Sequence, residues 1–203
     1  RLLNSDRAIG EIVSTESAQQ FEGYWRNDEA NEERTRDGIY WSGDLGYRDA
    51  QGFFYFAGRN MDWLRVDGEN IAAGPVERIL GRYGDIALAA VYAVPNADVG
   101  DDCMASLILR SGVTFDPDGF ARFLAGESDL GTKMAPRYVR VAEVLPSTET
   151  NKILKRVLRD EGWECDDPVW IREGDTYRRL EVEDRKTIRA AFSARGRIGE
   201  LDR

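Results

Sequence analysis

Three side chains, far apart in the sequence, have the chemistry to handle a nucleotide and a carboxylic acid. Asp44 follows a glycine after an apolar run, and a carboxylate placed there can accept hydrogen bonds from both hydroxyls of a ribose. Arg59 carries a permanent, planar charge that suits a ribose oxygen or a phosphate. Lys152 is a compact ammonium on a flexible stem, which can reach a carboxylate and a phosphate together and stabilise charge as one attacks the other.

Lysine is rare in this chain, so its positions are informative. Only four of the 28 basic residues are lysines, namely Lys133, Lys152, Lys155 and Lys186. A codon bias toward arginine is the plain explanation of that ratio. Each candidate also has a plain explanation when it is taken alone, since Gly43-Asp44 can be a turn, Arg59 part of a linker, and Lys152 a solvated helix end.

Gly68 is a fourth position of interest. Residues 63–66 and 69–71 are β-prone and flank Asp67-Gly68, the strongest short signal for a hairpin with a type I′ turn. Glycine has no side chain, so this turn would let a narrow substituent pass close to the backbone. We therefore expect a hairpin whose tip can approach a narrow ligand.

The first 57 residues are predicted to be rich in β-structure. Residues 9–13 favour a short strand, and the polar stretch 14–38 favours loops with one helical turn. Residues 47–56 favour two strands joined by an Asp-Ala-Gln-Gly turn. Asp44 is thus expected at the end of a strand.

Short strands and helices alternate beyond residue 58, which predicts an α+β fold. The expected strands cover residues 86–94, 103–109 and 138–141. The expected helices begin at Pro75 and cover residues 116–125, 152–159 and 183–193. Thr150 or Asn151 would cap the third of these helices, placing Lys152 in its first turn. Residues 163–170 are acidic and are expected to be irregular.

The composition excludes several classes of protein. Histidine is absent, which rules out a serine–histidine hydrolase, a histidine-ligated zinc centre and a histidine general base in this chain. Cys103 and Cys165 have no metal-ligand spacing, so no metal site is predicted. A net charge of −9 argues against nucleic-acid binding. Residues 86–94, the longest apolar run, are too short to span a bilayer, so we expect a cytoplasmic protein and leave peripheral membrane association open.

Three segments, in this order and at these separations, resemble motifs of the adenylate-forming superfamily of acyl-CoA synthetases, luciferases and peptide-synthetase adenylation domains. They are residues 40–45, 58–71 and 145–156. Upstream, Gly10-Glu11-Ile12 with Gly23-Tyr24-Trp25 is similar to a motif that precedes the Gly-Asp-Leu segment in that superfamily. The resemblance covers residues 8–160.

Within the superfamily, residues 40–44 and 63–70 look most like fatty acyl-CoA ligases near the fatty-acid-transport and very-long-chain group. The tail, with residues 167–170 and Tyr177, fits that group. The resemblance therefore implies a long- or very-long-chain fatty acid–CoA ligase, which uses ATP, Mg²⁺ and CoA. Lipid metabolism is the setting that it implies.

The resemblance implies a reaction in two steps. A fatty acid carboxylate attacks the α-phosphate of ATP to give acyl-adenylate and pyrophosphate, and the thiol of CoA then displaces AMP. It assigns Asp44 to the ribose hydroxyls, Arg59 to the ribose and Lys152 to adenylation. The small domain would then rotate, withdrawing Lys152 and bringing Gly68 and Glu69 to the thioester step.

The hinge for this rotation is expected at Asn60, Met61 and Asp62. The family usually has an acidic residue or lysine two positions after Arg59, whereas this chain has Met61 there and its acid at Asp62. The hinge assignment therefore departs from the family pattern by one residue.

The family's phosphate loop, its magnesium-linked carboxylate and its acyl pocket lie upstream of these motifs and are not in this sequence. We therefore expect a carboxy-terminal portion that is inactive alone and leaves most of the Mg²⁺ binding to the rest of the enzyme. Residues 1–57 are predicted to end a large AMP-binding domain. Residues 58–160 would form the mobile small domain, and residues 161–203 a carboxy-terminal extension.

Three other readings remain open. An acyl-AMP ligase could pass the acyl group to a carrier protein, since a pantetheine arm fits the same passage as CoA. A non-catalytic interaction module could keep the small-domain fold, although retention of Asp44, Arg59 and Lys152 argues against it. A nucleotide sensor would bind AMP tightly by itself.

Overall fold

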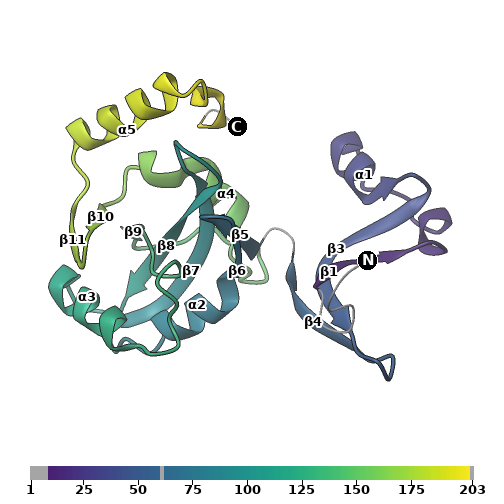
Figure 1. Cartoon of the computed structure of the whole chain (residues 1–203), viewed down its shortest axis with the longest axis horizontal. Helices are drawn as coiled ribbons and strands as arrows, with labels where there is room; N and C mark the ends of the chain where they lie inside the picture. The colour runs from purple at the N-terminus through teal and green to yellow at the C-terminus, as the bar shows by residue number, and fades with distance from the viewer. Residues whose placement is uncertain (1–8, 60–61, 202–203) are drawn as a thin grey trace. The chain divides into compact units, whose positions relative to one another are not determined.

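The computed structural model describes residues 9–59 and 62–201, and its contacts divide the chain into two units, residues 1–61 and 62–203 (Figure 1). Each unit has its own sheet. The chain is thus mixed in its helices and strands, and the boundaries expected at residues 57 and 160 stay predictions.

The first unit is built around one antiparallel sheet in which β3 pairs with every other strand. Its elements are β1 (Gly10–Ser14), η1 (Ser17–Gln19), α1 (Asp28–Arg34), β2 (Thr35–Arg36), β3 (Ile39–Arg48) and β4 (Phe54–Arg59). The turn before β4 forms because a carboxylate oxygen of Asp49 accepts from the N–H groups of Gln51 and Phe53, at 3.0 and 2.9 Å. The predicted β-rich character is confirmed, although α1 is longer than the single turn expected.

The second unit contains a hairpin and a five-stranded sheet in the order β11-β10-β9-β8-β7. The β8–β9 pair is parallel and the others are antiparallel. Its elements are β5 (Trp63–Val66), β6 (Glu69–Ala72), α2 (Ala73–Leu80), β7 (Ile86–Pro95), β8 (Asp101–Leu109), α3 (Pro117–Gly126), β9 (Tyr138–Val141), α4 (Lys155–Glu161), η3 (Gly162–Glu164), β10 (Val169–Glu173), β11 (Thr176–Arg179), α5 (Val182–Ala194) and η4 (Ile198–Glu200).

Two apolar cores cover the two faces of this sheet, because successive strand residues point to opposite sides. On β7, Val91 belongs to the core that α2 and α3 complete, whereas Tyr92 belongs to the core that α4 and α5 complete. Figure 1 shows α2 and α3 on one side of the sheet and α4 and α5 on the other. Phe120 and Phe192, each at most 1% exposed, anchor α3 and α5.

The structure corrects three boundaries. The α2 helix begins at Ala73, so Pro75 is its third residue and not its first. The α4 helix begins at Lys155, so neither Thr150 nor Asn151 caps it and Lys152 precedes it. Residues 163–170, which we expected to be irregular, begin in the short helix η3 and end in strand β10, which with β11 extends the sheet beyond β9.

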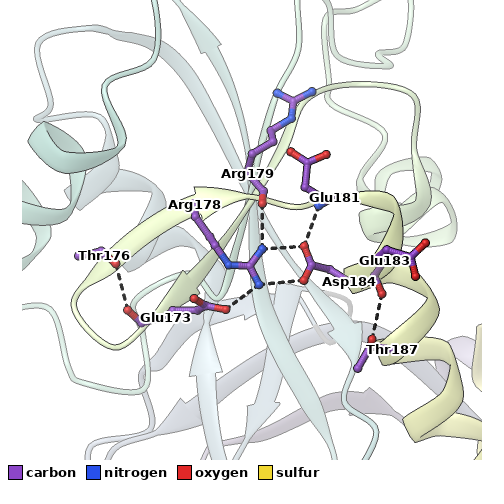
Figure 2. Close-up of polar contacts among 8 residues, drawn as sticks. All are labelled: Glu173, Thr176, Arg178, Arg179, Glu181, Glu183, Asp184 and Thr187. Carbon is purple, nitrogen blue, oxygen red and sulfur yellow. Dashed lines mark hydrogen bonds and ion pairs between the residues drawn. The ribbon is translucent and has the colours of Figure 1, made fainter.

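The segment after residue 161 is fastened to the unit by charged groups. Figure 2 shows Arg178 between two carboxylates, with 2.6 and 2.8 Å to Asp184 and 2.6 Å to Glu173. Asp184 also accepts from the backbone N–H of Glu181 at 2.8 Å, which closes a capping box at the start of α5. The β10–β11 hairpin and α5 therefore share one polar joint.

Within the described ranges, no helix combines the length and apolar character that a membrane span requires. The same ranges contain no cluster of three or more acidic, cysteine or histidine side chains that could hold a metal ion.

Candidate functional site

Asp44 lies inside β3 and not at its end, where we had expected it. The sheet continues past it because β1 and β4 pair with β3 on either side of this position. Its own N–H donates to the hydroxyl of Ser42 at 3.1 Å, and that hydroxyl donates to the carbonyl of Ile12 at 2.6 Å. The backbone that carries the carboxylate is therefore held by a side chain as well as by strand pairing.

Gly43 allows a close approach that helps to fix this segment. Its φ is +75°, and a Cβ added there would lie 2.3 Å from the Arg34 guanidinium. Arg34 donates to the carbonyl of Trp41 at 3.1 Å, while the N–H of Gly43 donates to Glu11 at 2.9 Å. A larger residue at position 43 would have to displace this arginine.

Arg59 is the cross-strand partner of Asp44, because their Cα atoms are paired between β3 and β4. Two of the predicted site residues, 15 positions apart in the sequence, are thus brought together by strand pairing. The Cβ atoms of directly opposite residues lie about 4.5–5.5 Å apart in an antiparallel sheet. The predicted hinge residues Asn60 and Met61 lie outside the described residues, and Asp62 opens the second unit.

The hairpin tip has the predicted geometry. Asp67 and Gly68 have φ of +46° and +81°, as a type I′ turn requires, and nothing lies within 4 Å of a Cβ built on Gly68. Lys133 braces the turn from another loop by donating to the Asp67 carbonyl at 3.3 Å and to Glu69 at 2.8 Å. The hydrogen bond to Glu69 raises the pKa of Lys133 above its usual value.

Lys152 lies on a tight loop before α4 and is exposed. The backbone of Lys152 pairs with Thr148, whose N–H donates to the Lys152 carbonyl at 2.8 Å and whose hydroxyl accepts from the Lys152 N–H at 3.1 Å. Asn151 adopts a positive φ of 60° in this loop, and Ser147 bridges to Ile153. The loop, and not a helix terminus, presents the ammonium.

Lys155 has a structural position that the sequence analysis did not single out. It is the first residue of α4, and its ammonium lies 3.1 Å from Asp62 and 2.9 Å from Glu77 on α2. Glu77 also accepts from the backbone N–H of Val91 on β7, at 2.8 Å. Its only signal in the sequence was a lysine in a chain that otherwise uses arginine.

The chemistry is therefore divided between the two units. The first unit carries Asp44 and Arg59 at paired positions of neighbouring strands. The second presents the ammonium of Lys152 and the open turn at Gly68. The roles expected for these residues stay predictions.

Several curated proteins similar to this chain are named as acid–CoA ligases or acyl-CoA synthetases. A steroid-22-oyl-CoA synthetase of Rhodococcus jostii is 48% identical over 200 residues, which is 97% of this chain and 36% of the relative. A medium/long-chain-fatty-acid–CoA ligase, FadD17, of Mycobacterium marinum is 53% identical over 163 residues, which is 80% of this chain and 32% of the relative. Neither name supports the predicted similarity to the fatty-acid-transport and very-long-chain group of ligases.

This chain also matches parts of solved structures. ATP-bound MatB from Rhodopseudomonas palustris matches 69% of this chain and 28% of its own with a TM-score of 0.57 and 30% identity. The o-succinylbenzoate CoA synthetase MenE from Bacillus subtilis, in complex with an acyl-adenylate, matches 75% of this chain and 30% of its own with a TM-score of 0.57 and 27% identity. No family model matches the chain. The chain spans about a third of the length of these relatives.

Proposed function

Because this chain is a segment of the adenylate-forming acyl-CoA ligase superfamily, we propose that it serves as the carboxy-terminal portion of an ATP-dependent fatty acid–CoA ligase. The name of the FadD17 relative favours a medium- or long-chain acid, and that of the steroid-22-oyl-CoA synthetase favours a larger, ring-bearing acid. A carboxylic acid, ATP and CoA are the proposed substrates.

The proposal rests mainly on the ammonium of Lys152. Lys133, Lys155 and Lys186 each form an ion pair, whereas the Lys152 ammonium makes no ion pair or hydrogen bond within the described residues. A lysine that is held at the tip of a braced loop, with its charge left available, suits a mobile anionic substrate. The other three lysines are used within the fold.

The proposed mechanism has two steps. In the first, a carboxylate oxygen of the acid attacks the α-phosphorus of ATP, pyrophosphate leaves, and Lys152 stabilises the negative charge that develops between the two groups. Asp44 accepts hydrogen bonds from the ribose hydroxyls, and Arg59 assists there. In the second, the CoA sulfur attacks the acyl carbon, AMP leaves, and the thiol proton is lost to solvent. The Gly68 turn lines the path of the pantetheine arm.

A direct test joins this chain to the amino-terminal portion of the Mycobacterium marinum relative, which spans the missing length. The fusion is given ATP, Mg²⁺, CoA and carboxylic acids of graded size, and mass spectrometry identifies the products. We expect acyl-CoA from the fusion and none from the 203-residue chain alone.

Variants at two lysines decide the role of Lys152. Lys152→Ala should lower the rate of adenylate formation about 100-fold or more, since removal of one charge-stabilising group has that scale of effect. Lys186→Ala, at a surface ion pair, should leave the rate unchanged. Acyl-adenylate that accumulates in the presence of CoA would favour transfer to a carrier protein, and absence of any adenylate would refute the proposal.

A further inference from the structure

The turn between β7 and β8 lies against the hairpin that carries Gly68. The Asp101 carboxylate accepts from the backbone N–H of Arg65 on β5 at 2.8 Å. Gly100, with φ of +63°, approaches the Arg65 carbonyl so closely that an added Cβ would lie 2.4 Å from it. A larger residue at position 100 would clash with β5, so the turn packs directly against the backbone of this strand.

Two arginines that follow α5 also contact the turn between β7 and β8. The guanidinium of Arg195 donates to the Asp98 carboxylate and forms an ion pair with it. Arg197 donates to the backbone carbonyl of Asp98 at 3.2 Å. Phe192, 1% exposed, fixes the end of α5 in the core from which these arginines extend.

The turn between these two contacts is internally braced. The side-chain oxygen of Asn96 accepts from the N–H groups of Asp98 and Val99, at 2.8 and 3.3 Å. Its side-chain nitrogen donates to Asp102 at 2.9 Å, and its backbone N–H donates to the Gly100 carbonyl at 3.0 Å. These four hydrogen bonds, all made by Asn96, tie the residues of the turn to one another.

We propose that the carboxy-terminal extension positions the Gly68 turn for thioester formation, acting through the β7–β8 turn. Arg195 and Arg197 are the positioning residues, and neither touches a substrate. Lys133 braces the tip of the hairpin, while the extension fixes its β5 strand through Arg65. The catalytic effect in this inference rests on the proposed function. The contacts that link Arg195 and Arg197 to β5 do not depend on that function.

The first test separates the two half-reactions in the ligase fusion. The double variant Arg195→Ala/Arg197→Ala should keep adenylation, followed by ATP–pyrophosphate exchange, within about twofold. It should slow CoA-dependent product formation about fivefold, because loss of exposed contacts of this kind changes a rate or population by a small factor. The matched control is Arg189→Ala, on helix α5 just before these residues, which pairs with Glu164 and should slow neither step.

The second test measures hydrogen exchange in the 203-residue chain and needs no catalysis. The amides of residues 65–68 should exchange faster in the double variant than in the Arg189→Ala control. Unchanged exchange there, or an equal fall in both half-reactions, would overturn the inference. If the unaltered fusion makes adenylate but no acyl-CoA, the proposed CoA step fails, while the exchange result still decides whether the extension holds the hairpin.

Discussion

The ammonium of Lys155 lies 3.1 Å from the carboxylate of Asp62, which joins the first described residue of the second unit to the first residue of α4. Glu77 completes this arrangement from α2, at 2.9 Å from the same ammonium. Lys152 precedes α4 by three residues, so the loop that presents it is anchored at a point beside the predicted hinge. Lys155 thus connects the start of the second unit to the loop that carries Lys152.

Replacement of Lys155 by alanine should therefore destabilise the second unit. We expect a loss of about 1–2 kcal/mol in the free energy of unfolding, because the side chain is 20% exposed and its removal leaves Asp62 and Glu77 without this partner. Urea denaturation followed by circular dichroism measures the loss. Lys186→Ala is the control, since its 66% exposed side chain should contribute less than about 0.5 kcal/mol. Equal losses in the two variants would contradict the prediction.

Local chemistry explains which elements could be predicted from the sequence. The Asp67-Gly68 hairpin and the α3 helix capped by Asp116 follow from residues within a few positions of each other. Strands β10 and β11 could not be predicted, because Val169 and Ile171 are buried only by packing against a sheet assembled from distant segments. The late start of α4 has a different, local cause, since pairing between Thr148 and Lys152 takes the place of the first expected helical turn.

The sequence indicated which residue types form the candidate site, but not which of these residues lie next to one another. Nothing local indicates that Asp44 and Arg59 are cross-strand partners, because this depends on the register of β3 and β4 and its irregularity at residues 45 and 46. The pairing of Lys155 with Asp62 spans 93 positions and requires α4 to pack beside α2. Such long-range pairings depend on the whole fold.

The role proposed for Asp44 predicts a specific kinetic defect. In the ligase fusion, Asp44→Asn should raise KM for ATP about tenfold, because one hydrogen bond to a charged acceptor is weakened. Asp37→Asn is the control, since Asp37 lies at a turn with φ of 54°, a conformation that asparagine accepts readily. Steady-state kinetics with varied ATP distinguishes the two variants, and equal KM values would remove Asp44 from the nucleotide site.

Gly68 and Gly112 form a matched pair for testing the turn. Their φ values are +81° and +78°, and a Cβ at either position meets nothing within 4 Å. Replacement by alanine should therefore cost each variant about 1 kcal/mol of stability from backbone strain alone. Only Gly68→Ala should also slow the CoA-dependent step in the fusion, because its methyl group would enter the proposed path of the pantetheine arm. Equal rates of that step in both variants would refute this path.

The two thiols should differ in reactivity. Cys103 is 2% exposed, and burial raises its pKa well above the usual range, so very little thiolate is present or accessible. Cys165 is partly exposed, and burial raises its pKa as well. A chromogenic disulfide reagent should modify Cys165 first, and Cys103 only as the unit unfolds. Simultaneous modification in the folded chain, read by mass spectrometry, would contradict this order.

The ion pairs of Arg178 shown in Figure 2 should make the joint between the β10–β11 hairpin and α5 sensitive to acid. Hydrogen bonds from Arg178 lower the pKa of Asp184 from 3.8 to about 2. Because the folded-state pKa is the lower one, the stabilisation is complete above about pH 4 and is lost as the pH falls toward about 2. The stability difference between the unaltered chain and Asp184→Asn, from urea denaturation, should be constant above pH 4 and shrink below it. Asp175→Asn, at a 98% exposed carboxylate of the same hairpin, should show no such trend, and a difference for Asp184→Asn that is independent of pH would exclude this joint as the acid-sensitive contact.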